Sequence, residues 1–97
     1  MTTYPFDMQK LIEVCRQNDV VKVSIFGSMA RGEATEQSDI DLLVEFSRRK
    51  SLLALVALER KLSLTLGHQV DLLTEAAISP YLRDLILHDQ QVIYEAR

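Results

Sequence analysis

The feature that most constrains the fold is the alternation of residues 39–46, in which apolar side chains recur with a period of two. A period of two places successive side chains on opposite faces of an extended strand. The apolar face carries Ile40, Leu42, Val44 and Phe46. The other face carries Asp39, Asp41, Leu43 and Glu45. The segment is therefore predicted to be a strand with one buried face and a second face that presents two carboxylates.

The rest of the chain alternates between helical and extended patterns. Helices are predicted from residue 8 to 15, briefly at 28–32, between a candidate N-cap Ser51 and a candidate C′ residue Gly67, and from Ser79 and Pro80 onward. Further strands are predicted at residues 20–26, 69–73 and 91–95, the last at a sheet edge. This order of elements predicts the α/β class.

Length and composition narrow the function classes. A chain of 97 residues is predicted to form one domain, residues 1–97, that can bury a core without disulfides. The net charge of −3 gives no general electrostatic reason to bind DNA. A single cysteine, Cys15, sits on the apolar face of the first helix and is predicted to be buried. No secretory leader and no apolar stretch of about 18 residues is found, so a cytoplasmic protein without a membrane span is expected.

Two aspartates on one strand face need a counter-charge. Asp39 and Asp41 point the same way, and Asp71 lies in a later strand with Val70 and Leu72 on the opposite side. If the strands are neighbours, three carboxylates can converge. Two such charges about 4 Å apart repel by roughly 4 kcal/mol at an effective dielectric near 20. Mg²⁺ is usually held by one or two carboxylates together with substrate phosphates, so the acids predict a metal and a polyphosphate.

A glycine and a serine precede these acids. Gly27 ends the strand at residues 20–26, and Ser28 begins the predicted short helix. Glycine permits unusual φ and close backbone approach, and an exposed N–H at a helix start suits an anion. Each motif alone is common, but together they predict a phosphate beside the metal.

Gly27-Ser28, ten intervening residues, Asp39-Ile40-Asp41 and a later Asp71 resemble the nucleotidyltransferase superfamily that includes DNA polymerase beta. More narrowly, "GSMARGEATEQSDIDLLVEF" and the leucine-rich segment that ends in "VDLLT" resemble the minimal nucleotidyltransferases, usually encoded beside a HEPN-domain partner. The resemblance covers nearly the whole chain. It implies a mixed β-sheet flanked by helices and an antitoxin that transfers AMP from ATP to a tyrosine of a HEPN ribonuclease toxin.

The resemblance also assigns residues to roles. It implies that Gly27 and Ser28 bind the triphosphate of ATP and that Asp39, Asp41 and Asp71 hold two Mg²⁺ ions. Asp71 is then either a metal ligand alone or also the general base for the incoming hydroxyl.

Two further residues near the phosphate site have alternative roles. Arg31 either contacts the nucleotide or pairs with Glu33 or Glu36. Ser38 either binds phosphate or acts as a cap.

The helix between Ser51 and Gly67 has more leucine than one buried stripe needs. The row predicted to face the core is Leu55, Leu58, Leu62 and Leu66. Leu53, Ala57 and Leu64 lie off that row. Either a second layer of this domain covers them, or they form a surface that binds a partner. The basic run 48–50 is predicted to be a solvated loop, although an acidic partner could use it.

Three functions remain open from the sequence. The first is an active AMP transferase acting on a protein tyrosine, with the HEPN toxin as partner. The second is a non-catalytic antitoxin that binds and occludes the toxin. The third is a nucleotidyltransferase for a small molecule such as an antibiotic, which is less economical because no extra domain is available to hold the acceptor.

Overall fold

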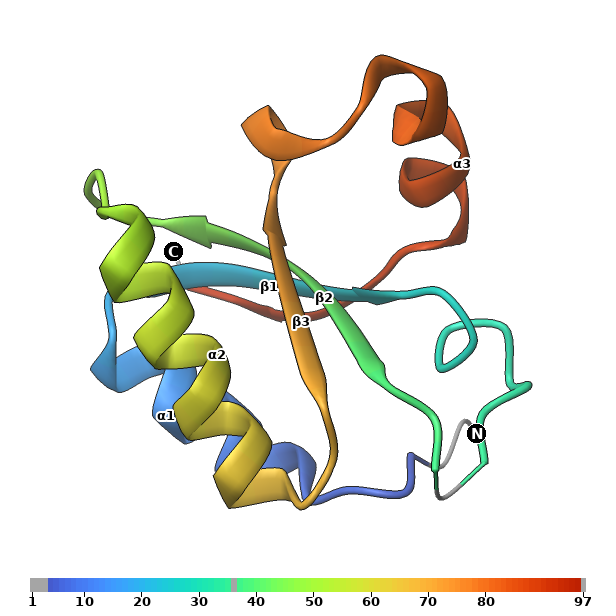
Figure 1. The fold of residues 1–97 in the computed structure, drawn as a ribbon, viewed down its shortest axis with the longest axis horizontal. Helices are drawn as coiled ribbons and strands as arrows, with labels where there is room; N and C mark the ends of the chain where they lie inside the picture. The colour runs from blue at the N-terminus through green and yellow to red at the C-terminus, as the bar shows by residue number, and fades with distance from the viewer. Residues whose placement is uncertain (1–3, 36, 97) are drawn as a thin grey trace.

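The computed structural model describes residues 4–35 and 37–96. Helices and strands alternate along this part of the chain, which confirms the α/β class (Figure 1). In chain order they are α1 (Met8–Gln17), β1 (Val20–Phe26), β2 (Ile40–Phe46), α2 (Leu52–Leu66), β3 (Val70–Thr74), η1 (Glu75–Ala77), α3 (Pro80–Asp89) and β4 (Gln91–Glu95). Every predicted strand is confirmed, and so are three of the four predicted helices.

The strands form one mixed sheet in the order β3-β2-β1-β4. β1 is antiparallel to both of its neighbours, whereas β2 and β3 are parallel and are connected by α2. β4 forms one edge, as the sequence predicted. In the register of β2 and β3, Asp41 lies opposite Asp71, and in the register of β1 and β2, Phe26 lies opposite Asp41. The end of β1 and the starts of β2 and β3 therefore meet at one end of the sheet.

Side chains that accept backbone N–H groups fix where the helices begin. The Asp7 carboxylate accepts from the N–H groups of Gln9 and Lys10, and the Ser51 hydroxyl accepts from Ala54. Such caps satisfy donors that the first helical turn leaves without partners. Gly67, with φ of 71°, ends α2 in the left-handed conformation. The predicted caps at Ser51 and Gly67 are thus confirmed.

The predicted short helix at residues 28–32 is wrong, because this segment forms consecutive turns. A single helix-like bond runs from the Arg31 N–H to the Gly27 carbonyl (3.2 Å), and the next bond, from Gly32 to Met29, spans three residues (3.3 Å). Gly32 has φ of 72°, which a continuing helix cannot use. Met29 is 1% exposed and holds the turns against the core.

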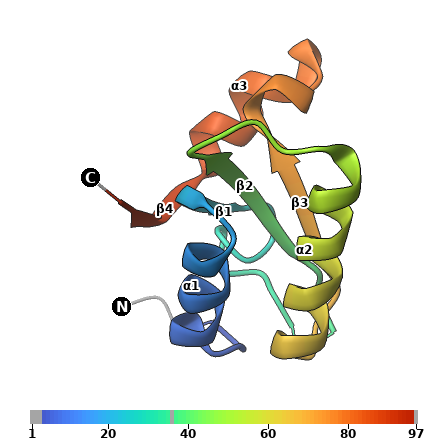
Figure 2. The same ribbon diagram turned by 90° about the vertical axis from the view of Figure 1, so that its left-hand side faces the viewer.

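The main core lies on one face of the sheet, which α1 and α2 cover side by side (Figure 2). α2 contributes Leu58, Leu62 and Leu66 to this core, with Leu55 partly buried against it, as its leucine row predicted. α1 contributes Leu11, Val14 and Cys15. Burial raises the pKa of the Cys15 thiol to about 12, so Cys15 is a core residue, as predicted.

The second face of the sheet is largely open. A smaller apolar cluster of Phe26, Leu43 and Ile78 lies on it, with Ile86 and Leu87 of α3 packed against the cluster. α3 lies beyond the end of β3, away from α1 and α2 (Figure 1). We call this side of the sheet the open face.

The free edge of β3 is closed by side chains of α2. The Val70 N–H donates to the Ser63 hydroxyl (2.9 Å), and the Leu72 N–H donates to the Glu59 carboxylate (2.8 Å). An unprotected edge strand is a template for pairing with other chains. These two bonds therefore fix α2 on the sheet and remove that hazard.

Two leucines of α2 face away from the core. Leu53 is 82% exposed and Leu64 is 81% exposed, so the prediction that they lie off the core row is confirmed. Within the described residues, none of the helices is both long and apolar enough for a membrane crossing.

Candidate active site

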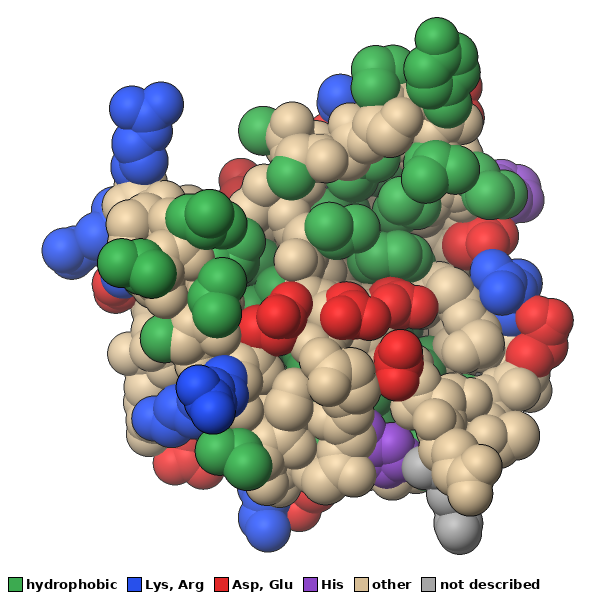
Figure 3. Space-filling view, viewed as in Figure 1, with side chains coloured by type: hydrophobic (Ala, Val, Ile, Leu, Met, Phe, Trp, Pro, Cys, Tyr) green, Lys and Arg blue, Asp and Glu red, His purple; other side chains and the backbone are tan. Residues whose placement is uncertain are grey.

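The carboxylates of Asp41 and Asp71 face each other on the open face. Their strands are parallel neighbours in register, so the two side chains project from the same level of the sheet. Figure 3 shows acidic side chains gathered near the middle of the view, with apolar groups to the left over α2 and above toward α3. The condition for convergence, that the two strands are neighbours, is confirmed, and it brings Asp41 and Asp71 together.

The acid pair changes the protonation of Asp41. Partial burial, followed by the charges of Asp71 and Asp39, raises the pKa of Asp41 to about 6. A hydrogen bond to Asp71, which only protonated Asp41 can donate, acts in the same direction, while Arg31 opposes it. Near neutral pH, Asp41 is thus mostly ionised, and the positive charge near it does not balance its negative charge.

Asp39 lies one residue before β2 and is exposed, and it acts on Asp41 through its charge. Within the described residues, no three acidic, imidazole or thiol groups are already spaced as metal ligands. Bringing Asp39 into one ligand set with Asp41 and Asp71 would therefore require side-chain adjustment. The donors themselves fit Mg²⁺, which prefers carboxylate oxygens and keeps positions for phosphate and water.

Gly27 is required at its position for two independent reasons. Its φ is 72°, a conformation that L side chains rarely adopt, and a Cβ built on it would lie 2.5 Å from Oδ2 of Asp41. The backbone at the end of β1 therefore lies directly against the Asp41 side chain. Ser28 follows in the same turn, half-buried, and its carbonyl accepts from the Glu33 N–H (3.0 Å). Gly27 thus lies beside the Asp41 carboxylate, and Ser28 is the next residue of the chain.

The Arg31 guanidinium forms ion pairs with two acidic side chains of this protein. Its Nε lies 2.7 Å from Oε1 of Glu33, and its Nη1 lies 3.1 Å from Oδ2 of Asp89. Pairing with Glu33 was one of the two roles foreseen, and Glu36 lies outside the described residues. Nucleotide contact by Arg31 stays a prediction. Asp89 was not foreseen, because 58 residues separate it from Arg31 and no local pattern connects them.

Ser38 closes the turn that leads into β2. Its hydroxyl accepts from the Thr35 N–H (2.8 Å), and its carbonyl oxygen lies 3.4 Å from Nδ1 of His68. The Ser38 hydroxyl therefore stabilises a turn and caps no helix. Phosphate binding by Ser38 stays a prediction.

Comparison with known proteins agrees with this geometry. The model of the family described as "Nucleotidyltransferase domain" matches residues 8–93. A candidate protein adenylyltransferase of Methanocaldococcus jannaschii is 49% identical over 81 residues, covering 84% of this chain and 87% of the relative. Protein adenylyltransferase MntA of Thermococcus cleftensis is 39% identical over 75 residues, covering 77% and 74% of the two chains.

A solved structure extends the likeness to the fold. A crystal structure of a toxin-antitoxin with AMP-PNP superposes with a TM-score of 0.81 at 25% identity, covering 94% of this chain and 75% of that one. The chain belongs to the nucleotidyltransferase family and, within it, to the protein adenylyltransferases.

Proposed function

We propose that this protein, acting in the cytoplasm as a single domain of residues 1–97, transfers AMP from Mg-ATP to a tyrosine of a HEPN-class toxin and so neutralises it. The observation that carries the proposal is the Asp41 and Asp71 pair, held against Gly27 on the open face. The relatives named as protein adenylyltransferases and the similarity to a toxin-antitoxin bound to AMP-PNP support it.

The chain's residues divide the work of the reaction. Asp41 and Asp71, joined by Asp39, would hold two Mg²⁺ ions, which supply positive charge to the triphosphate and the departing pyrophosphate. Gly27 and Ser28 would orient the triphosphate. The tyrosine oxygen bonds to the α-phosphorus as the bond to the bridging oxygen breaks, and pyrophosphate leaves with that electron pair. In this proposal Asp71 would also accept the phenolic proton.

The deciding experiment uses Asp71→Asn, which keeps the size of the side chain and removes its charge. The partner toxin is incubated with Mg²⁺, ATP and either the wild type or the variant, and its intact mass is measured. Wild type should add increments of ~329 Da, the mass of an AMP group delivered by two-metal chemistry. The variant should add none and should still bind the toxin. Glu13→Gln, an exposed change on α1, is the matched control and should transfer normally.

Occlusion of the toxin without catalysis is the competing function. If Asp71→Asn protects cells fully while no adduct forms on the toxin, occlusion is the better explanation. Calorimetric titration with ATP gives a second check, since affinity should fall in excess chelator. Equal affinity with and without Mg²⁺ would remove the metal from the mechanism.

We also propose that the exposed leucines of α2 contact the partner. Leu53 and Leu64 are eleven residues apart, so at 100° per residue they fall on the same side of the helix, about 16 Å apart along its axis. Leu53→Glu or Leu64→Glu should weaken the complex in analytical ultracentrifugation while circular dichroism stays native. Unchanged association of both variants would contradict this role.

A further inference from the structure

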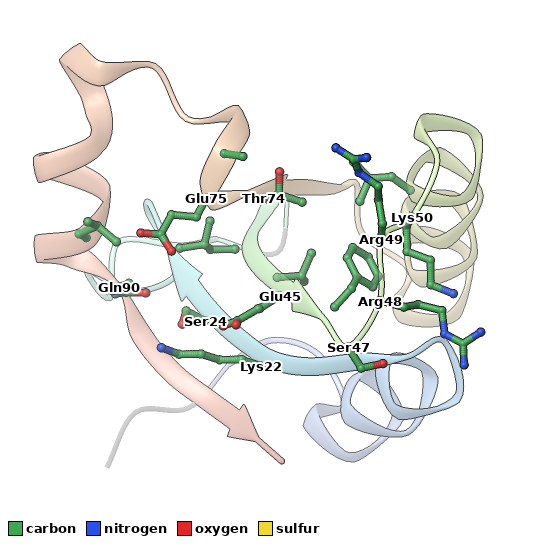
Figure 4. A pocket seen from close by; sticks show the side chains of 16 residues that line it. Lys22, Ser24, Glu45, Ser47, Arg48, Arg49, Lys50, Thr74, Glu75 and Gln90 are labelled. Carbon is green, nitrogen blue, oxygen red and sulfur yellow. The ribbon is translucent and has the colours of Figure 1, made fainter. Parts of the chain in front are cut away.

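A cavity of about 700 Å³ opens on the open face, beyond the acid pair (Figure 4). It is lined by residues of β1, β2, the loop after β2, η1 and α3, and it extends around the end of β2 to Thr74 of β3 and Leu55 of α2. Its size is within the range of small-ligand and side-chain binding sites. None of Asp39, Asp41 and Asp71 lines it, so the cavity is adjacent to the candidate active site and distinct from it.

The lining combines apolar area with a buried hydroxyl. Leu43, Phe46 and Leu87 supply apolar surface. Ser24, in the middle of β1, is 1% exposed and lines the same cavity. Its hydroxyl is therefore one of the few neutral hydrogen-bonding groups that the floor of the cavity offers to a ligand. A serine hydroxyl can both donate and accept a hydrogen bond, so a ligand that enters the cavity meets apolar surface together with one polar contact.

The mouth of the cavity is basic. Four of its lining side chains are cationic and two are anionic, although the chain as a whole carries −3. Lys50 and Arg48 share one partner, Asp19, whose Oδ2 lies 2.6 Å and 3.6 Å from them. Arg49 is exposed and forms no ion pair with any described residue. Positive charge therefore collects at this mouth and is complementary to carboxylates of a ligand.

The cavity and the acid pair lie along the same strand face. Leu43 follows Asp41 by two residues on β2, so the cavity begins about 7 Å from the level of the acids. An extended peptide covers about 3.3–3.6 Å per residue. A chain that places a tyrosine at Asp41 and Asp71 would therefore place a residue two to four positions away in the cavity.

We propose that the cavity docks the segment of the protein substrate next to its acceptor tyrosine and selects an apolar side chain accompanied by carboxylates, two to four residues from that tyrosine. This inference rests on the proposed function, because it assumes a tyrosine acceptor. It explains how a domain of this size could choose one tyrosine among many. Shape, the Ser24 hydroxyl and the Arg49 charge each contribute part of the selection.

Fluorescence anisotropy with labelled synthetic peptides tests the proposal without requiring transfer. One peptide carries leucine and two glutamates three residues from a tyrosine, a second replaces the glutamates with lysines, and a third moves the glutamates and leucine ten residues away. The first peptide should bind at least tenfold more tightly than the second and several-fold more tightly than the third. Equal affinity for the first two would overturn the proposal.

Variants of the lining residues test whether the peptides bind in the cavity. Arg49→Glu should weaken the glutamate peptide about tenfold and strengthen the lysine peptide, and Ser24→Ala should weaken the glutamate peptide several-fold. Lys10→Glu makes the same charge change on the exposed side of α1 and should alter neither. Mg-ATP affinity should be unchanged in all three variants. If Arg49→Glu or Ser24→Ala instead lowers Mg-ATP affinity and leaves the peptides unaffected, the cavity holds nucleotide and the proposal is wrong.

The two proposals can fail separately. Absence of AMP transfer by wild type would contradict the proposed function, while peptide discrimination by Arg49 would still stand as a measured property of the cavity. Normal transfer combined with equal binding of all peptides would contradict only the docking site.

Discussion

The two faces of the sheet differ in what their residues do, although the same strands build both. The face covered by α1 and α2 is continuous apolar core, to which β2 contributes Ile40, Leu42 and Val44. The open face carries Asp41, Leu43 and Glu45 of the same strand, so acids and a small apolar cluster share it. Stability is concentrated on one side of β2 and chemistry on the other, because alternate residues of a strand point to opposite faces.

The repulsion between carboxylates on the open face is tolerated because apolar burial on the covered face stabilises the fold. An acid pair that lacks a counter-charge opposes folding, and a small domain has only about 5–15 kcal/mol of net stability. The fifteen buried residues of the main cluster provide the reserve on which the site depends. Substitutions on the covered face should therefore mainly lower stability, whereas substitutions on the open face should mainly change function.

The largest expected effect is on the covered face. Leu62→Ala removes a fully buried side chain of α2 and should lower the free energy of unfolding by about 2–5 kcal/mol. Leu64→Ala makes the same chemical change two residues away, at an exposed position, and should change it by less than about 0.5 kcal/mol. Urea denaturation of both variants measures the contrast. Similar losses at the two positions would show that α2 is covered on both sides.

Much of the covered face was predictable because its signals are local. The alternation of residues 39–46 gives β2 and its buried row, while Ser51, Gly67 and Ser79 mark helix ends through bonds to groups a few residues away. The same alternation put Asp39 and Asp41 on one strand face, and the resemblance assigned them, together with Asp71, to metal binding. Parallel pairing of β2 and β3, which brings Asp71 opposite Asp41, was a condition that the local pattern alone could not settle.

The features that were missed depend on distant contacts or on backbone geometry. The segment 28–32 has helix-forming residues, but left-handed conformations at Gly27 and Gly32 limit it to turns. The cavity joins Ser24, Arg49 and Gln90, which are far apart in the chain. One signal was available, since Lys22 and Ser24 are two polar residues with a period of two in an otherwise apolar strand. That pattern indicates a second, polar face of β1.

A second test addresses the point where backbone and acid pair meet. Gly27→Ala should lower the free energy of unfolding by about 2–4 kcal/mol, because it adds a contact with Asp41 to an unfavourable φ. Gly67→Ala has nearly the same φ, 71°, and open space around its Cβ, so it should cost only about 1–2 kcal/mol. Thermal and urea unfolding report both values.

A double variant separates the two causes. With Asp41→Ala as the background, the carboxylate that would meet the new Cβ is absent, and the excess cost of Gly27→Ala over Gly67→Ala should shrink. An undiminished excess would mean that backbone strain, and not contact with Asp41, makes glycine necessary here.

The smallest expected effect is a gain of stability on the open face. Asp41 has a pKa of about 6 in the folded protein, above its ordinary value near 3.9, so its ionisation opposes folding. The cost is absent below about pH 4, grows as pH rises to about 6 and is complete above that. In excess chelator at pH 7, Asp41→Asn should therefore raise the free energy of unfolding by about 1 kcal/mol, since water screens part of the repulsion at this half-exposed site.

The pH profile decides whether that gain comes from charge. The advantage of Asp41→Asn over wild type should fall toward zero as pH is lowered from 7 to about 4, because wild-type Asp41 then becomes neutral as well. Asp84→Asn, on the exposed surface of α3, should show no such convergence. Adding Mg²⁺ should reverse the order at pH 7, stabilising wild type more than the variant, because binding to the folded state adds to its stability. An advantage that persists unchanged at pH 4 would mean that Asn stabilises through packing, and the acid pair would then no longer represent a stability cost of the active site.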